Sequence, residues 1–435
     1  MLRSLPRLPM LPALSLSLLA CTALLAPGAA AQNAPTQTNG GAAAAKPAGV
    51  TAYTNARILP GGRPAIASGT LVVGGGKILA LGDATVPIPN GAAVVDCSGR
   101  TITPGLIDAS FAGGANADDL NEQSDEITPA LRVLDSLDPE DPKFARARRS
   151  GVTAVHVMPG NRNVIGGLGC GVKTAGSDPA AMVMREDASL HITLGAEPSM
   201  GNRAIRGGRV ESMYYRRPTT RMGVIWEVRR AFFDAQEALQ KSLGESPPGS
   251  DPGIEVLTRV LQGKLTAVTT ARSEQDVRTA LRIAAEFGYQ TVLDDAQDAY
   301  MVADELAQAK TTVLLGAPSA EEVAGSAGAD GAEPKSGTVR ALADRGVPFI
   351  ITTGSNAAAL DLVREAMFAV RNGLGPQQAL DAITVEPAKL LGIDDRVGRL
   401  APGLDADFVV WSNDPLDPAA VAASVHIDGI CVFSR

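Results

Sequence analysis

The chain has 435 residues, 45% of them hydrophobic, with 46 glycines and a formal net charge of −8 at pH 7. Such a composition can bury a large core, and it excludes collagen, a coiled coil and a disordered chain. The acidic balance, without a long basic run, also excludes a typical nucleic-acid binder, which neutralises phosphates with clustered Lys and Arg. Only three histidines are present, so a metal site built from several histidines is almost ruled out.

The first 31 residues have the features of a signal peptide. Arg3 and Arg7 make the start positive, residues 11–25 are apolar, and small residues precede Gln32. The apolar run is shorter than the roughly 20 residues that span a bilayer. We therefore predict export to the periplasm or the medium, without a transmembrane span. Alternatively, the run ending in Cys21 resembles a lipobox, and this cysteine would then carry a lipid anchor.

Residues 32–50 are small and polar, without periodicity, which is typical of a flexible tether. Beyond Cys21, the chain has only Cys97, Cys170 and Cys431, too few for a disulfide framework in a protein of this size. A single bridge between Cys97 and Cys431 would form if their two segments meet.

The remaining chain divides into β-rich ends and an alternating middle. Residues 51–103 contain short β-branched runs broken by glycine turns, and residues 396–435 return to strand patterns. Between them, strand-like runs alternate with runs that have apolar residues at helical spacing. The strands expected in this middle part are 152–158, 265–270, 291–294, 311–316 and 347–353, and the helices are 274–287, 300–309, 339–344 and 360–372.

This alternation predicts the fold class. Strands that alternate with helices build a parallel sheet with helices outside it, and the length of the middle part suits an eight-stranded (β/α)8 TIM-like barrel. Each β-rich end alone is too small for its own core. We therefore predict that residues 51–103 and 396–435 form one composite β-sandwich, next to a barrel of residues 104–395.

Two motifs flank the predicted barrel. One runs from residue 95 to Thr-Pro-Gly-Leu-Ile-Asp at residues 103–108, and the other covers residues 386–392 and 398–411. Together with residues 121–129, they resemble the imidazolonepropionase-like and prolidase-like branch of the amidohydrolase superfamily. The resemblance implies one or two divalent metals at the carboxyl ends of the barrel strands, where metal-bound water attacks a non-peptide carbon–nitrogen bond.

The metal ligands that this resemblance implies are absent. Where the superfamily has His-x-His after its first barrel strand, this chain has Ser110 and Ala112, which are poor or impossible zinc ligands. Arg272 and Asp295 stand where further histidines are expected. Gly354 stands where the resemblance places an aspartate that is both ligand and general base. We therefore predict no metal and no other cofactor.

Three remaining side chains are catalytic candidates. His156 and His191 lie in strand-like runs, where each is either a hydrogen-bonded core residue or a ligand at the barrel mouth. Asp294 and Asp295 are neighbours on one strand, so only one of them can face the site. Asp295 is the candidate. His426, in the terminal β segment, is predicted to be structural.

Candidates for ligand binding are Asn121 and Glu122, in an acidic loop, and Arg272. Residues 202–221 concentrate arginines around two tyrosines. This pattern indicates either a basic patch for an anionic ligand or a partner chain, or a solvated loop.

The glycine-rich run at residues 166–171 could suggest a phosphate cradle, but no Lys-Ser or Lys-Thr follows it. We therefore predict a tight loop. Cys170 has no histidine nearby in sequence to activate its thiol as a nucleophile. Residues 320–335 have low complexity and are predicted to be an excursion from the barrel surface.

Two functions are compatible with these observations. The first is an exported amidohydrolase-like protein without catalysis, which binds a small molecule or pairs with a partner chain such as an active paralogue. The second is an active hydrolase of carbon–nitrogen bonds with a rebuilt site of His156, His191 and a carboxylate such as Asp295, with zinc or another divalent metal. This second function requires the three side chains to converge within about 4 Å.

Overall fold

The computed structural model describes residues 49–435 except 123, 201–216, 243–250, 317–336 and 355–360. The predicted signal peptide, almost all of the tether, most of the arginine-rich stretch and the excursion at 320–335 lie outside the described residues. Among the helices of the described ranges, none is both long enough and apolar enough to cross a membrane.

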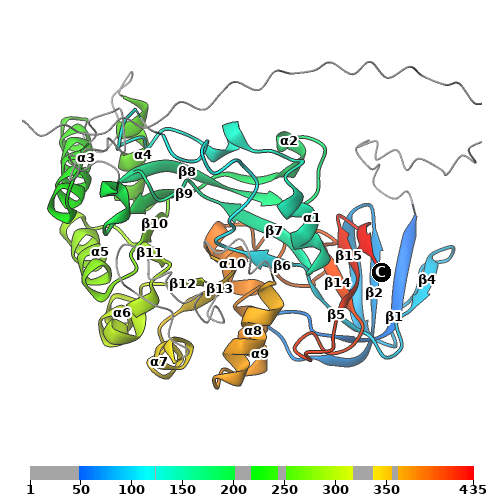
Figure 1. Ribbon diagram of the computed structural model, residues 1–435. Coiled ribbons are helices and arrows are strands. Elements are labelled where there is room, and N and C mark those ends of the chain that lie inside the picture. Colours follow the sequence, from blue (N-terminus) through cyan, green and yellow to red (C-terminus); the bar gives the residue numbers. More distant parts are fainter. Residues whose placement is uncertain (1–48, 123, 201–216, 243–250, 317–336, 355–360) are drawn as a thin grey trace, which may run out of the picture. The chain divides into compact units, whose positions relative to one another are not determined.

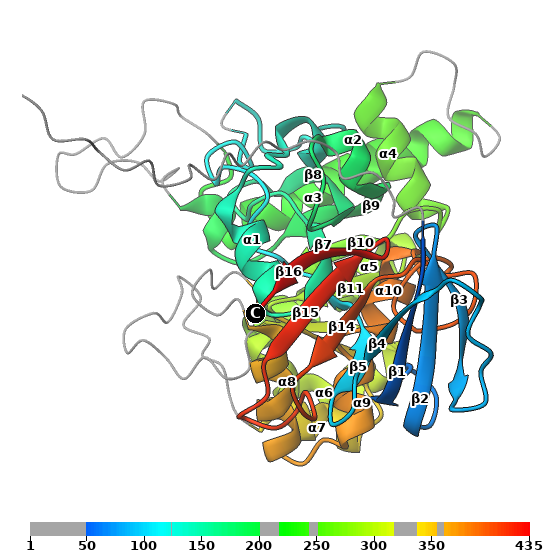
Figure 2. The same cartoon turned by 90° about the vertical axis from the view of Figure 1, so that its right-hand side faces the viewer.

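Strands from both ends of the chain share one sheet, here called the terminal sheet. Within the described residues its order is β16-β15-β14-β5-β1-β2-β3, and β4 pairs with β1. Figure 2 shows the red C-terminal strands next to the blue and cyan N-terminal ones. The strands are β1 (Val50–Ile58), β2 (Ile66–Gly74), β3 (Lys77–Asp83), β4 (Ala93–Asp96), β5 (Thr101–Pro104), β14 (Phe408–Trp411), β15 (Ala422–Ile427) and β16 (Ile430–Ser434).

The two ends of the chain meet between β5 and β14. These strands are antiparallel, with Thr103 opposite Val409, and β5 pairs in parallel with β1. Across the same junction, Nε1 of Trp411 donates to Oγ1 of Thr103 at 2.9 Å. His426 on β15 stacks on the ring of Phe408 with centroids 4.3 Å apart, so this histidine packs within the terminal sheet.

The second sheet, here called the central sheet, has the order β13-β12-β11-β10-β9-β8-β7-β6 within the described residues. Neighbouring strands are parallel, except that β8 is antiparallel to both β7 and β9. An isolated parallel bridge joins Phe111 and Gly354, just beyond the two end strands. The strands are β6 (Leu106–Asp108), β7 (Val152–Val157), β8 (Ile165–Lys173), β9 (Val183–Thr193), β10 (Ala267–Thr270), β11 (Thr291–Asp294), β12 (Val313–Gly316) and β13 (Phe349–Thr352).

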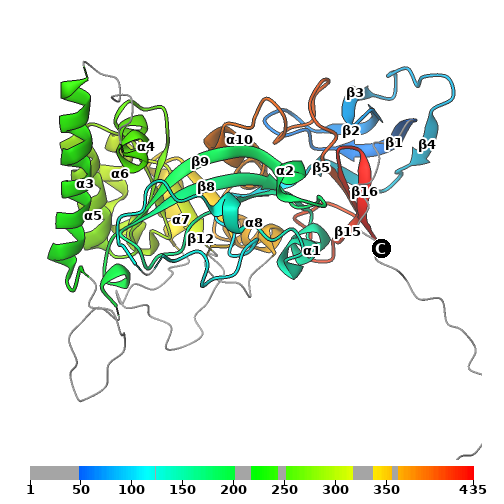
Figure 3. The same ribbon diagram turned by 90° about the horizontal axis from the view of Figure 1, so that it is seen from above.

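Strand β8 corrects two expectations. The tight loop predicted at residues 166–171 is wrong, because these residues lie within β8, which Figure 3 shows alongside β9. The glycines there allow close packing: a Cβ on Gly169 would lie 2.7 Å from Nε2 of His156 and 3.0 Å from the carbonyl oxygen of Val157. The expectation of a wholly parallel sheet is wrong at the same strand, and the central sheet is mixed.

Helices follow the strands of the central sheet, as the alternation predicts. Figure 1 shows α5, α6 and α7 next to β10, β11 and β12. The α-helices are α1 (Pro142–Arg149), α2 (Pro179–Met182), α3 (Arg221–Lys241), α4 (Pro252–Leu261), α5 (Glu274–Phe287), α6 (Ala303–Ala309), α7 (Thr338–Asp344), α8 (Leu362–Arg371), α9 (Pro376–Asp381) and α10 (Val385–Leu391), and the short 3-10 helices are η1 (Val133–Ser136), η2 (Glu197–Ser199) and η3 (Gln297–Val302).

Helix α5 illustrates why these segments are helical. Ser273 caps its first turn by accepting a hydrogen bond from the backbone nitrogen of Asp276. Its buried face carries Val277, Ala280 and Ala284 at helical spacing, and Gly288 ends the helix in the left-handed region with φ +75°. The helix predicted at residues 274–287 is therefore confirmed.

A buried ion cluster connects β8 with the terminal sheet. Nζ of Lys173, whose side chain is 3% exposed, lies 2.8 Å from Asp405, 3.1 Å from Asp407 and 3.0 Å from Asp428. Asp407 directly precedes β14, and Asp428 lies in the turn between β15 and β16. We call Lys173 with these three carboxylates the lysine cluster.

The cysteines of the described ranges form no bridge. Cys97 and Cys170 are buried and Cys431 is exposed, and all three are free thiols. The bridge considered between Cys97 and Cys431 is therefore not formed in this structure.

Candidate functional site

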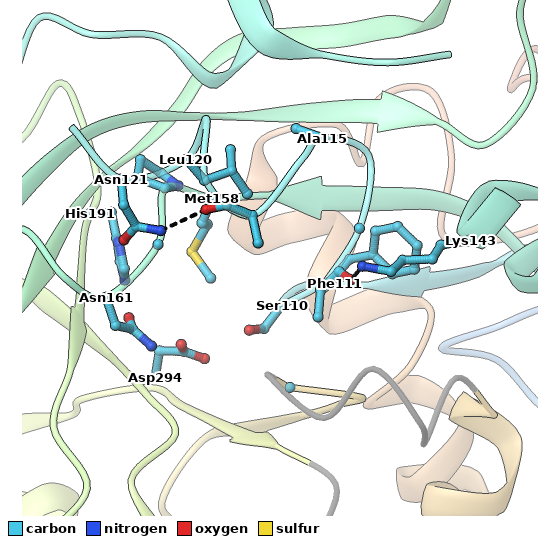
Figure 4. Close-up of a pocket in the computed structure, with 16 residues that line it drawn as sticks. Ser110, Phe111, Ala115, Leu120, Asn121, Lys143, Met158, Asn161, His191 and Asp294 are labelled. Carbon is cyan, nitrogen blue, oxygen red and sulfur yellow. Dashed lines mark hydrogen bonds between the residues drawn. The ribbon is translucent and has the colours of Figure 1, made fainter. Parts of the chain in front are cut away.

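A pocket of about 300 Å³ opens at the carboxyl ends of the central-sheet strands. Asp294 ends β11, while Ser110 and Gly354 follow closely after β6 and β13. Figure 4 shows Ser110 and Asp294 pointing toward each other, with His191 and Asn161 nearby. Among the described residues, the lining consists of Ser110, Phe111, Ala112, Gly113, Ala115, Ala117, Leu120, Asn121, Lys143, Met158, Pro159, Gly160, Asn161, His191, Asp294 and Gly354.

Asp294 is the buried carboxyl group of this pocket. It is 6% exposed, and its Oδ2 accepts a hydrogen bond from Oγ1 of Thr270 at 3.3 Å, whereas its buried Oδ1 has no hydrogen-bond partner among the described residues. Burial, together with the negative charge of Asp295, raises the pKa of Asp294 to about 7, against the opposing effect of the Ser110 hydroxyl, Arg272 and Thr270. Such a carboxyl group exchanges a proton near neutral pH.

His191 joins Asp294 through a threonine. Nε2 of His191 lies 3.0 Å from Oγ1 of Thr270, which itself donates to Asp294. Because the Thr270 hydroxyl has a single proton, its oxygen must accept from Nε2–H, so Nδ1 of His191 is unprotonated. Within the part of the chain that the structure describes, this buried Nδ1 has no hydrogen-bond partner. Burial, then the proximity of His156 and Arg272, lowers the pKa of His191 to about 3, so the imidazole is neutral.

His156 is a core residue. It is fully buried, Nδ1 lies 3.1 Å from the carbonyl oxygen of Ala109, and Nε2 lies 3.0 Å from Oγ of Ser189. Since a carbonyl oxygen only accepts, Nδ1 donates, and Nε2 accepts from Ser189. Burial lowers the pKa of His156 to about 4. Both ring nitrogens are thus satisfied away from the pocket, whose lining does not include His156.

Asp295 and Arg272 bind each other instead of facing the pocket. Nε of Arg272 donates to Oδ2 of Asp295 at 2.6 Å, and its Nη1 pairs with Glu197. The side chain of Arg272 is 13% exposed. Its burial is outweighed by the two carboxylates, which raise its pKa. Neither residue lines the pocket, so of the two adjacent aspartates the structure turns Asp294, and not the favoured Asp295, toward it.

Asn121 lines the pocket, but its amide already has backbone partners. Its Nδ2 donates to the carbonyl oxygen of Ala117 at 2.8 Å, and its Oδ1 accepts from the backbone nitrogen of Arg162 at 3.0 Å. Glu122 accepts from the backbone nitrogen of Ser124 and is not part of the lining. The acidic loop therefore contributes a wall through Asn121, with Glu122 outside the pocket.

The metal that the resemblance implies does not fit the residues present. Of the positions compared, Ser110, Ala112 and Gly354 do line the pocket, but they offer one hydroxyl group as their only side-chain donor. In the part of the chain that the structure describes, no group of three or more His, Cys, Asp or Glu could hold a metal ion. His156, His191 and Asp295 do not converge on one point of the pocket.

Two further residues lie at this end of the sheet, and Thr270 was not predicted as a site residue. Thr270, which connects His191 with Asp294, follows a run of small β-branched residues that carries no motif. Asp108 is fully enclosed, and accepts from the hydroxyl and backbone nitrogen of Thr353 and from the backbone nitrogen of Ser110. Burial raises the pKa of Asp108 to about 6 in spite of these donors. Through these hydrogen bonds, Asp108 connects the segment after β6 with the segment after β13.

Comparison with known proteins identifies similar chains. Residues 273–430 match the model of the amidohydrolase family. The chain is 31% identical over 380 residues to the amidohydrolase tasK of Hapsidospora irregularis, over 80% of this chain. It is 42% identical over 57 residues to the imidazolonepropionase of Hahella chejuensis, over 13% of this chain. It spans 38% and 14%, respectively, of the lengths of these two relatives.

A solved structure is similar over nearly the whole described chain. The crystal structure of an amidohydrolase from Thermotoga maritima MSB8 superposes with a TM-score of 0.79 at 30% identity. The match covers 88% of this chain and 100% of the other. The two proteins are therefore similar in both fold and sequence over most of this chain.

Proposed function

The chain belongs to the amidohydrolase superfamily, and from this premise we propose that it is a non-catalytic member, which binds a small polar molecule in the pocket. A partner chain, such as an active paralogue, would then bind this protein in either its ligand-bound or its ligand-free form. The observation that carries the proposal is the pocket itself. It keeps a buried carboxyl group and a buried imidazole, each with an acceptor atom that has no partner among the described residues, at the place where the expected metal ligands are missing.

The chemistry of the donors supports binding rather than metal-assisted hydrolysis. The positions that correspond to metal ligands in the superfamily are occupied here by Ser110, Ala112 and Gly354, which all line the pocket. Arg272, at a fourth such position, forms ion pairs with two carboxylates. A metal that activates water needs about three protein ligands with an open position. No step through a metal is therefore assigned to this chain.

Metal content of the purified protein tests the proposal. We expect far less than one zinc, manganese, iron or other transition metal per chain by elemental analysis after exposure to each metal and desalting. Stoichiometric metal that disappears in His191→Ala, but stays in His426→Ala, would overturn the proposal. His426 is the matched control, because it is a buried histidine of the terminal sheet, stacked on Phe408.

One observation favours a second function, a metal-independent hydrolase. Asp294 has a pKa near neutrality and lies in the pocket, as a general acid or base requires. In this function the rebuilt site would consist of Asp294 and His191, since His156 and Asp295 have other partners. Turnover of N-acyl amino acids or lactams, reduced at least about 100-fold in Asp294→Asn, would establish it. Absence of turnover leaves the binding function.

Export is part of the proposal. The basic start, the apolar run and the small residues before Gln32 support cleavage after residue 31 and release into the periplasm or the medium. Mass spectrometry of the protein secreted by its host should find Gln32 as the first residue. A mature chain that begins at a lipid-modified Cys21 would support the anchored form instead.

We also propose that the central sheet closes into a barrel. The bridge between Phe111 and Gly354 and the hydrogen bonds from Thr353 to Asp108 support closure between the segments after β13 and β6.

A further inference from the structure

The pocket carboxyl group of Asp294 is less well compensated than its buried neighbours. Asp295 has Arg272 at 2.6 Å, and Asp108 accepts three hydrogen bonds. Asp294 accepts a long hydrogen bond from Thr270 and faces the Ser110 hydroxyl, but its buried Oδ1 has no hydrogen-bond partner among the described residues. A buried charge without a partner is costly, because its hydration is lost and nothing replaces it.

The second unsatisfied atom of the pocket is also an acceptor. Nδ1 of His191 is buried and unprotonated in the arrangement set by Thr270, and no described residue is its hydrogen-bond partner. A ligand that satisfies both His191 and Asp294 must therefore donate hydrogen bonds. Two N–H groups on one ligand would meet this requirement, and a positive charge on them would compensate the carboxylate.

The other walls determine the rest of the ligand. Phe111, Leu120 and Met158 give the pocket apolar surface, and its volume of about 300 Å³ suits a small organic molecule. The charge of Arg272 is taken up by Glu197 and Asp295, so it does not neutralise Asp294. A bare metal ion is disfavoured because the described residues offer no group of three ligating side chains.

We propose that the pocket binds a small organic cation with at least two N–H donors beside an apolar body, such as an amidinium or a guanidinium compound. The donors engage Oδ1 of Asp294 and Nδ1 of His191, and the apolar body contacts Phe111, Leu120 and Met158. This inference rests on the proposed binding function and specifies its ligand class.

Two pairs of probes with matched shape test the charge requirement. Benzamidinium is compared with neutral benzamide, and guanidinium with urea, by calorimetry or ligand-observed NMR on the full mature chain at pH 8. We expect each cation to bind at least about tenfold more tightly than its neutral partner, and benzamidinium more tightly than guanidinium because of its ring. Asp294→Asn should abolish the preference for the cation.

A matched variant and a pH series distinguish loss of the carboxylate from a general loss of the native fold. Asp344→Asn removes an exposed carboxylate that pairs with Arg340 and should leave both affinities unchanged. In the unaltered protein, affinity for benzamidinium should rise at least about tenfold from pH 6 to pH 8 as Asp294 ionises, while affinity for benzamide stays constant. The charged or titratable groups near Asp294 are Asp295, Arg272 and His191, and Lys143 also lines the pocket, where its Nζ donates to the carbonyl oxygen of Ala112. His191 stays neutral over this range.

Other outcomes overturn the inference. Equal or tighter binding of benzamide and urea would show a neutral ligand, and binding of none of the four probes would show that the pocket has another occupant. Both results leave the proposed binding function standing, since that proposal fails on stoichiometric metal. Cation binding that persists in Asp294→Asn would place the cation elsewhere on the chain.

Discussion

Two adjacent aspartates at the carboxyl end of β11 point in different directions, one into the pocket and the other toward an arginine. Asp294 keeps the strand geometry and turns into the pocket, whereas Asp295 adopts the left-handed region with φ +53° and pairs with Arg272. Strand alternation predicts that only one of them can face the site. The sequence does not reveal which one, because the answer depends on where β11 ends and on Arg272, which belongs to the neighbouring strand segment.

The raised pKa of Asp294 predicts a pH-dependent gain of stability in Asp294→Asn. The folded-state pKa of about 7 lies above the ordinary 3.8, so the folded state favours the protonated form and loses stability as pH rises from about 4 to about 7. Asparagine has a similar shape without this ionisation. The free energy of unfolding of the variant relative to the original should grow by roughly 2–3 kcal/mol between pH 5 and pH 8. Urea denaturation without ligand measures it.

The same measurement on Asp344→Asn is the control, since that carboxylate is half exposed on the surface. It should show no comparable growth between pH 5 and pH 8. A difference between Asp294→Asn and the original that stays constant with pH would contradict the raised pKa. It would mean that Asp294 is ionised throughout this range, with partners that compensate it.

Among the elements, regular strands and helices followed from local patterns, and β8 did not. The predicted helix 274–287 has a serine cap, apolar residues at helical spacing and a final glycine, all readable from the sequence. In β8 the glycines carry no side-chain pattern. Their reason lies in distant residues, since Gly169 packs on His156 of β7 and Gly167, with φ +119°, passes the carbonyl oxygen of Leu131.

Two glycines of β8 offer a matched pair of substitutions. A methyl group on Gly169 would meet Nε2 of His156 at 2.7 Å and the carbonyl oxygen of Val157 at 3.0 Å. On Gly171 it would lie 3.6 Å from Cβ of Arg185, an ordinary contact. We expect Gly169→Ala to lower the free energy of unfolding by about 2 kcal/mol or more, and Gly171→Ala to change it by less than about 1 kcal/mol.

Chemical denaturation of both variants checks this expectation, with near-UV circular dichroism as a control for the native fold. Equal effects of Gly169→Ala and Gly171→Ala would show that β8 tolerates a methyl group next to His156. The close packing of this strand on β7 would then not be required for stability.

The candidate site was predictable from motifs only in part. That metal ligands are missing at Ser110, Ala112 and Gly354 could be predicted by comparing these positions with the superfamily. The structure shows that all three residues line one pocket. The connection from His191 through Thr270 to Asp294 could not be predicted, because it joins three different strands. Its members become neighbours only through the register of β9, β10 and β11.

At the scale of the whole molecule, the lysine cluster connects β8 with segments more than two hundred residues later in the chain. Burial disfavours the charge on Lys173, but Asp407, Asp428 and Asp405 outweigh it and raise the pKa of Lys173. Removing Lys173 leaves Asp407 and Asp428 without this cation, while Asp405 keeps Lys77 and Arg396. We therefore expect the cluster to stabilise the contact between the central and the terminal sheet.

Lys173→Met should lower the free energy of unfolding by about 3–5 kcal/mol. Lys389→Met is the control, because Lys389 is half exposed and pairs with Glu386 one helical turn away, and it should cost less than about 1 kcal/mol. Thermal and urea denaturation measure both variants. Similar, small effects of the two substitutions would contradict a stabilising role of the lysine cluster.

The pairing of β5 with β14 also determines when the terminal sheet can be completed during synthesis of the chain. The edge of β5 at Thr101–Pro104 acquires its partner only when Phe408–Trp411, about 300 residues later in the chain, has been made. Until then, the first strands of the nascent chain expose an unsatisfied backbone edge, which can pair with other chains. Release before residue 408 should therefore leave this edge of β5 unpaired and direct the product to aggregation or to chaperones.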